Sequence, residues 1–224
     1  MKTHIGSGFA HSPRHSIAVM LVGTIIVATD LAIAEWGSYG FLIEARATLA
    51  VLVLALYSGL SDGDARSLGL RLAPIQGWWY WIRAGLAIGA IVGLLVVLGW
   101  GAWLLSGRAL PAYAAAPPPP ENLLTRFFFM CVFTPVLEEA IYRFALCIAI
   151  VSFGPWKAIA VSGFTFGLLH VVYGNPSPEN LLGGFFIAWA FLKSETIMLP
   201  VLLHGLGNLA ALTSQITAWY WQTA

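Results

Sequence analysis

The chain has 224 residues, of which 59% are hydrophobic and only 9% are charged, and its mean hydropathy is +0.81. A soluble domain is about 45–50% apolar and about 25% charged, so this composition excludes an ordinary soluble protein and indicates a polytopic membrane protein. The formal net charge of +1 provides no basic surface for nucleic acid, which is therefore excluded as a partner.

Runs of about 20 apolar residues predict an all-α transmembrane bundle of about seven spans, with eight as the alternative. Residues 1–121 are expected to form a three-span region that ends in a proline-rich connector, Pro117 to Pro120. Residues 122–224 are expected to form a separate catalytic membrane domain of four spans. The predicted spans are Ser16–Ala34, Phe41–Leu60, a third from Trp78 to the connector, Leu123–Ile150, Trp156–Tyr173, Leu181–Leu192 and Ile197–Ile216.

The first span ends in a triplet, Ala32 to Ala34, that resembles a signal-peptidase site. We expect the span to be retained, because its apolar run is long and contains Asp30. The distribution of basic residues predicts a cytoplasmic N-terminus and an outer C-terminus. The basic residues assigned to the inside are Lys2, Arg14, Arg66, Arg71, Lys157 and Lys193, and those assigned to the outside are Arg46, Arg108 and Arg126.

Small residues and aromatic residues mark the third span. Gly85, Gly89 and Gly93 recur at every fourth position, which predicts a smooth face for close helix packing. The run from Trp78 to Trp81 predicts an aromatic belt at the membrane interface.

The fourth span contains the most unusual residues of the chain, because charged side chains inside a membrane are costly and usually functional. Glu139 and Arg143 are four residues apart and share a helix face, so they are expected to form an ion pair. Glu138 points about 100° away, which predicts an unpaired carboxylate that can act as a base. Pro135 is expected to kink the helix. The alternative is a charge cluster that only locks two helices together. Cys131 and Cys147 are about 24 Å apart along this helix and cannot form a disulfide.

Two later spans each carry a polar pair at helical spacing. Phe166 and His170 lie on one face of the fifth span, and His204 and Asn208 lie on one face of the seventh. Taken singly, each pair is typical of packing or of hydrogen bonds between helices. Together with Glu138, two imidazoles and one amide could activate a water and hold an oxyanion, which are the requirements of amide hydrolysis. The sequence leaves the role of Asp30 and Glu35 open; a location at the outer end of the first span, where charge is inexpensive, would explain both without a function.

The three motifs occur in the order E-E-x-x-x-R (Glu138, Glu139, Arg143), F-x-x-x-H (Phe166, His170) and H-x-x-x-N (His204, Asn208). This ordered set, over about Leu123–Leu212, resembles the CPBP family, which comprises CAAX-protease and bacteriocin-processing intramembrane proteases and is also called Abi. The resemblance implies an intramembrane endopeptidase. It also implies roles: Glu138 as general base assisted by His170, His204 and Asn208 as the oxyanion site, Glu139 and Arg143 as site-ordering residues, and Phe166 as a packing residue.

The resemblance leaves the catalytic type open between a glutamic protease and a zinc metalloprotease. We favour a metal-free glutamic mechanism with no cofactor, because the histidines lie on different helices and form no H-E-x-x-H pair. The alternative is a zinc site formed by Glu138, His170 and His204. The expected partners are the lipid bilayer and a membrane-associated peptide or protein substrate, and the expected location is a prokaryotic cytoplasmic membrane. The oligomeric state is not predicted.

Two other functions fit some of the same residues. A transporter or proton relay would use the buried Glu and His residues as titrating sites, although such proteins usually contain inverted repeats with broken helices, which this chain lacks. A catalytically silent scaffold would use the glycine face to assemble partners, and its motif residues would be dispensable.

Overall fold

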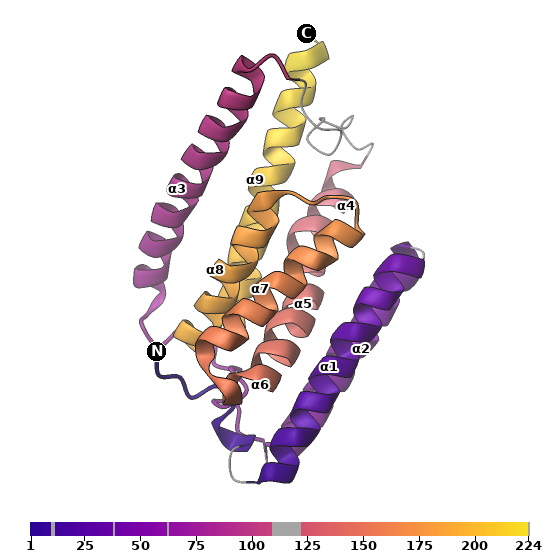
Figure 1. Cartoon of the computed structure of the whole chain (residues 1–224), viewed down its shortest axis with the longest axis vertical. Helices are drawn as coiled ribbons and strands as arrows, with labels where there is room; N and C mark the ends of the chain where they lie inside the picture. The colour runs from indigo at the N-terminus through magenta and orange to yellow at the C-terminus, as the bar shows by residue number, and fades with distance from the viewer. Residues whose placement is uncertain (10–11, 38, 62, 109–121, 224) are drawn as a thin grey trace.

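The computed structural model describes residues 1–9, 12–37, 39–61, 63–108 and 122–223, and these residues form a bundle of helices (Figure 1). The predicted all-α fold class is confirmed. Most of the helix boundaries fall within a few residues of the predicted spans, because long apolar runs bounded by Gly, Pro and polar residues determine where the helices begin and end. The helices are α1 (Pro13–Trp36), α2 (Tyr39–Leu60), α3 (Trp78–Leu105), α4 (Leu123–Phe127), α5 (Thr134–Glu139), α6 (Leu146–Ile150), α7 (Pro155–Val172), α8 (Pro178–Ser194) and α9 (Met198–Thr223).

Helices α4, α5 and α6 form one continuous rod, because two π-helical segments, Phe128–Phe133 and Ala140–Ala145, connect them. The rod coincides with the predicted fourth span. The predicted kink at Pro135 stays a prediction, but a π-helical segment ends directly before α5, which begins with Thr134 and Pro135. Such turns are rare and occur frequently at functional sites. Cys131 and Cys147 are buried and unbridged, as predicted.

Helices α1 and α2 pack side by side against the rod (Figure 1). Tyr57 of α2 is fully buried, and its hydroxyl donates towards the carbonyl oxygens of Val19 and Ala145, each 2.9 Å away. Gly23 allows the close approach of α1, because a Cβ there would collide with Ala149 and with Tyr57. These contacts hold the first two helices against the part of the rod that follows the charged residues.

Helices α7 and α8 pack closely against each other, since glycines face bulky side chains at their contact. A Cβ at Gly163 would overlap the ring of Phe185, and one at Gly167 would overlap Leu181. This small-to-large packing is typical of membrane helices. It fixes the position of α7, which carries two of the predicted site residues.

The N-terminal segment and the loop between α2 and α3 close one end of the bundle. The backbone N–H of His4 donates to Oε1 of Glu195 at 2.7 Å, and the N–H of Gly6 donates to the carbonyl of Ser67 at 2.9 Å. Glu195 itself is buried and has a positive φ of 57°, a conformation that a non-glycine residue adopts only with support from its surroundings. The contacts with the N-terminal segment provide that support.

Helix α3 packs against the bundle at its start, where Trp81 is buried against Trp189 of α8 with ring centroids 5.2 Å apart. Trp81 therefore belongs to the core, and the aromatic belt stays a prediction. The glycine face was predicted to pack closely, and within the described chain this is wrong at two of its three positions. Gly85 lies near Leu203, but no described atom stands within 4 Å of where a Cβ would be at Gly89 or Gly93.

Within the part of the chain that the structure describes, four helices, α1, α2, α3 and α7, are long and apolar enough to cross a membrane by length and composition. The protein is thus a multi-pass membrane protein, while the number of seven spans and the cytoplasmic N-terminus stay predictions. The proline-rich connector falls on residues 109–121, outside the described residues. The division into regions 1–121 and 122–224 also stays a prediction.

Candidate active site

The seven predicted site residues lie on three elements that the fold brings together. Glu138 and Glu139 end α5, and Arg143 lies in the π-helical turn that follows. The fifth and seventh predicted spans correspond to α7 and α9, so Phe166 and His170 come from α7, and His204 and Asn208 come from α9. The two glutamates, Arg143, Phe166 and His204 are buried, whereas His170 and Asn208 are partly buried.

Pro135 explains how Asn208 is held. The Thr134 N–H donates to the carbonyl of Phe129, and Pro135 has no N–H, so neither residue can bond to the carbonyl of Met130. Nδ2 of Asn208 donates to that carbonyl at 2.8 Å. Because a buried carbonyl without a partner is costly, the amide of Asn208 stabilises the turn before the glutamates. The second hydrogen on Nδ2 is left for another acceptor.

Gly205 determines how closely α9 approaches this turn, and it is a functional position that the sequence analysis missed. A Cβ on Gly205 would collide with the carbonyl oxygen of Cys131, whereas a Cβ on Gly207 would meet nothing within 4 Å. The H-x-x-x-N motif gave a partial signal, since it reads His204-Gly-Leu-Gly-Asn208 in this chain.

Gly205→Ala is therefore expected to push α9 away from the rod and to destabilise the protein by about 1–3 kcal/mol. The hydrogen bond between Asn208 and the carbonyl of Met130 should be lost at the same time. Gly207→Ala is the matched control, and its higher helix propensity should leave stability unchanged or raise it by up to about 1 kcal/mol. Thermal unfolding of both variants in the same detergent measures the difference. Equal melting temperatures would show that the close approach of α9 does not matter.

His204 lies between the two glutamates. Its Nδ1 is 2.7 Å from Oε1 of Glu139, and its Nε2 is 3.7 Å from Oε2 of Glu138. A carboxylate can only accept a hydrogen bond, so Nδ1–H donates to Glu139 and Nε2 faces Glu138. The two glutamates were expected to act separately, and the structure shows that one imidazole connects them.

The predicted ion pair is present: Nε of Arg143 lies 3.1 Å from Oε2 of Glu139, and both side chains are fully buried. The two atoms are not oriented for a hydrogen bond, so their attraction is mainly coulombic. Nη2 of Arg143 donates to the carbonyl of Gly184 at 3.1 Å. The guanidinium also stacks over the ring of Phe166, 4.3 Å from its centroid. Arg143 is thereby fixed between the rod, α7 and α8.

Phe166 connects the two histidines. Its ring centroid lies 4.6 Å from that of His170 and 5.5 Å from that of His204. Nδ1 of His170 lies 3.0 Å from the carbonyl of Phe166. Because a carbonyl only accepts, Nδ1 of His170 carries the hydrogen, and its Nε2 is left as an acceptor.

Glu138 is not the unpaired carboxylate that helix geometry predicted. Its Oε1 accepts a hydrogen bond from Nη1 of Arg46 at 2.7 Å. Arg46 was assigned to an outer segment, but it is buried inside the bundle, with 3% of its surface exposed. Asp30, whose role the sequence left open, is completely buried and bound to Arg46. Glu35 is exposed. The sequence contained a clue to both Arg46 and Asp30. Each is an ionisable residue in a predicted span, and such a residue indicates function by default.

The buried cluster does not have balanced charges. Three carboxylates, on Asp30, Glu138 and Glu139, face two guanidiniums, on Arg46 and Arg143. One negative charge therefore has no fixed cation, and His204, which contacts both glutamates, is the group placed to balance it. An unbalanced buried carboxylate next to an imidazole is an arrangement suited to proton transfer.

The choice between the metal-free site and the alternative zinc site stays a prediction. Among residues 1–9, 12–37, 39–61, 63–108 and 122–223, no group of three or more His, Cys, Asp and Glu side chains is arranged to hold a metal ion. His170 and His204 each direct Nδ1 at a protein oxygen, which leaves Nε2 of each for another partner.

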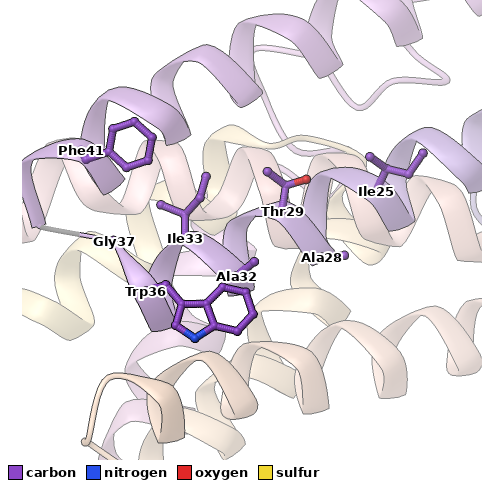
Figure 2. Close-up of a pocket in the computed structure, with 8 residues that line it drawn as sticks. All are labelled: Ile25, Ala28, Thr29, Ala32, Ile33, Trp36, Gly37 and Phe41. Carbon is purple, nitrogen blue, oxygen red and sulfur yellow. The ribbon is translucent and has the colours of Figure 1, made fainter.

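An open apolar groove of about 530 Å³ runs along α1 and ends at Phe41 of α2 (Figure 2). Ionisable side chains do not line it, and the buried cluster lies elsewhere. The lining residues are Ile25, Ala28, Thr29, Ala32, Ile33, Trp36, Gly37 and Phe41.

The fold and the site together define a class: a multi-pass membrane protein whose interior carries a glutamate–histidine–asparagine centre. Residues 120–210 match the family described as "Type II CAAX prenyl endopeptidase Rce1-like". This match agrees with the resemblance to the CAAX-protease family over residues 120–210. The comparisons with curated proteins and with solved structures gave no match. The matched segment contains all seven predicted site residues, whereas Asp30 and Arg46 lie outside it.

Proposed function

We propose that this protein is an intramembrane endopeptidase in which Glu138 activates a water molecule for attack on a peptide bond of a membrane-associated peptide or protein. The observation that carries the proposal is the pair of facing atoms Oε2 of Glu138 and Nε2 of His204, 3.7 Å apart, inside the segment that matches the endopeptidase family. A water deprotonated by Oε2 would therefore attack beside Nε2 of His204, which is placed to donate to the oxyanion that forms.

In the proposed reaction, the water oxygen bonds to the carbonyl carbon while one of its protons moves to Oε2 of Glu138. His170 accepts the other water hydrogen at Nε2 and so orients the attack. When the tetrahedral intermediate collapses, the carbon–nitrogen bond breaks and the proton on Glu138 passes to the leaving amine. The products are one carboxylic acid and one amine, so that no other reactant is needed.

The negative oxygen of the intermediate needs hydrogen-bond donors. The second hydrogen on Nδ2 of Asn208 is one donor. His204 is the other when both its ring nitrogens carry hydrogens, since Nδ1 donates to Glu139 and Nε2 then donates to the oxyanion. Glu139 stabilises this imidazolium, and Arg143 keeps Glu139 charged and fixed in position.

The proposal is tested with the full-length protein in lipid vesicles and a panel of peptides that end in a CAAX sequence, each with and without a prenyl group. Mass spectrometry would detect the released fragments. Cleavage of prenylated members supports the CAAX-type assignment, and cleavage of only the unprenylated members supports a peptide-maturation protease. No cleavage of any member, with intact folded protein, would contradict the endopeptidase proposal.

Metal dependence gives a separate prediction. No metal takes part in the proposed steps, so a chelating phenanthroline should leave the cleavage rate within about 2-fold of the untreated rate. In a zinc enzyme the same treatment would abolish activity, because the lost zinc contributes several kcal/mol of transition-state stabilisation. The non-chelating isomer is the control for inhibition by the compound itself. Loss of activity with the chelating isomer alone, and its recovery on addition of zinc, would establish the zinc mechanism instead.

A further inference from the structure

A second set of buried charges reaches the site from α1 and α2. Nε and Nη2 of Arg46 donate to the two oxygens of Asp30 at 2.6 and 2.9 Å, and Nη1 donates to Oε1 of Glu138 at 2.7 Å. The hydroxyl of Tyr142 donates to Oδ2 of Asp30 at 2.7 Å. The Tyr173 ring lies 5.5 Å from the guanidinium.

These contacts fix the plane of the guanidinium. Asp30 binds it at two points, which is the geometry that holds an arginine most rigidly. Tyr142 in turn holds Asp30, and Tyr142 and Glu138 are four residues apart on the rod. The chain of contacts therefore closes on itself, and Nη1 is directed at one oxygen of Glu138.

The contact with Glu138 has a consequence for the chemistry. Arg46 occupies Oε1, so Oε2 is the oxygen that remains for a water, and Oε2 is the one that faces His204. Asp30 alone supplies one counter-charge for Arg46, so the guanidinium does not need Glu138 for charge balance. The additional contact between Arg46 and Glu138 therefore suits a role in orienting the carboxylate of Glu138.

We propose that Arg46, held by Asp30, is a positioning residue for Glu138, so that the proteolytic site is built from both halves of the chain and extends beyond the segment that matches the endopeptidase family. This inference rests on the proposed function. It assigns to the first two helices a part in catalysis that the motifs do not contain.

Two variants test the positioning role. Arg46→Lys keeps the buried charge but cannot reach both Asp30 and Glu138 with a planar fork, and we expect kcat to fall about 10- to 100-fold with KM within about 2-fold. The double variant Asp30→Asn with Arg46→Gln removes one charge of each sign, so the net charge of the cluster is unchanged and the protein should fold. For this variant we expect a melting temperature above that of Arg46→Gln alone but below that of the wild type, because Glu138 loses its guanidinium partner, and kcat still reduced about 100-fold.

Tyr57→Phe is the matched control, because it removes a buried hydrogen bond between the same helices without touching the charges. It is expected to lower the melting temperature and to leave kcat unchanged. All rates are divided by the amount of folded protein, and Glu138→Gln is measured in parallel.

The outcomes separate this inference from the proposed function. If Glu138→Gln is inactive while Arg46→Lys and the double variant keep wild-type kcat, the positioning role is overturned and the protease assignment stands. If the double variant recovers both melting temperature and kcat, the cluster only holds helices together. If the wild type itself cleaves nothing, the proposed function fails first.

Discussion

Glu138→Gln is expected to reduce peptide-bond hydrolysis by about 10²- to 10⁴-fold, the usual contribution of a general base. The amide cannot take a proton from water, whereas it has nearly the same size and shape as the carboxylate. Its carbonyl oxygen still accepts a hydrogen bond from Nη1 of Arg46, so that contact can be kept. The measurement is the initial rate of fragment release from vesicles that contain equal amounts of wild-type or variant protein.

The control for this substitution is Glu35→Gln, which makes the same chemical change at an exposed glutamate of α1. Its rate should equal that of the wild type. A Glu138→Gln variant that folds and cleaves at the wild-type rate would contradict the assignment of Glu138 as the base. A wild-type protein that cleaves no peptide but moves protons across the vesicle membrane in a Glu138-dependent manner would favour the transporter alternative.

Much of the fold could be predicted because a bilayer imposes simple requirements on the sequence. Each membrane helix needs a long apolar run, and these runs gave the rod from Leu123 to Ile150 and its neighbours with errors of a few residues. The site motifs could also be predicted, since helical spacing places Glu139 next to Arg143, and the structure contains that ion pair. Contacts between residues of one helix can be predicted because they depend only on the spacing of those residues in the sequence.

Contacts between helices could not be predicted in the same way. Arg46 is 92 residues from Glu138 in the chain, and no spacing rule connects them. Whether Arg46 faces water, lipid or the site depends on the rotation of α2 against the rod, which is set by the packing around Tyr57 and Gly23. The same reason applies to His204: its sequence position does not reveal that it connects both glutamates. The exposed glycine face of α3 shows the reverse error, since a packing motif does not specify its partner.

Arg143→Met is expected to destabilise the protein by about 3–5 kcal/mol, the typical cost of breaking a buried ion pair by removing one partner. The methionine replaces the apolar stem of the arginine but leaves the carboxylate of Glu139 buried with only His204 beside it. It also removes the hydrogen bond to the carbonyl of Gly184 and the contact with the Phe166 ring. The measurement is the free energy of unfolding in mixed micelles. The same substitution at the exposed Arg83, which contacts the ring of Trp79, should cost no more than about 1 kcal/mol.

The double variant Glu139→Gln with Arg143→Met distinguishes a structural pair from a site-ordering one. It leaves no unpaired charge at this position, so most of the lost stability should return. The glutamine oxygen can still accept a hydrogen bond from Nδ1 of His204, but it does not stabilise an imidazolium as a carboxylate does. We therefore expect a folded protein that remains at least about 10-fold slower than the wild type, because the oxyanion donor on His204 is weakened. Recovery of the full rate together with stability would show that Glu139 and Arg143 hold the helices but contribute nothing to the chemistry.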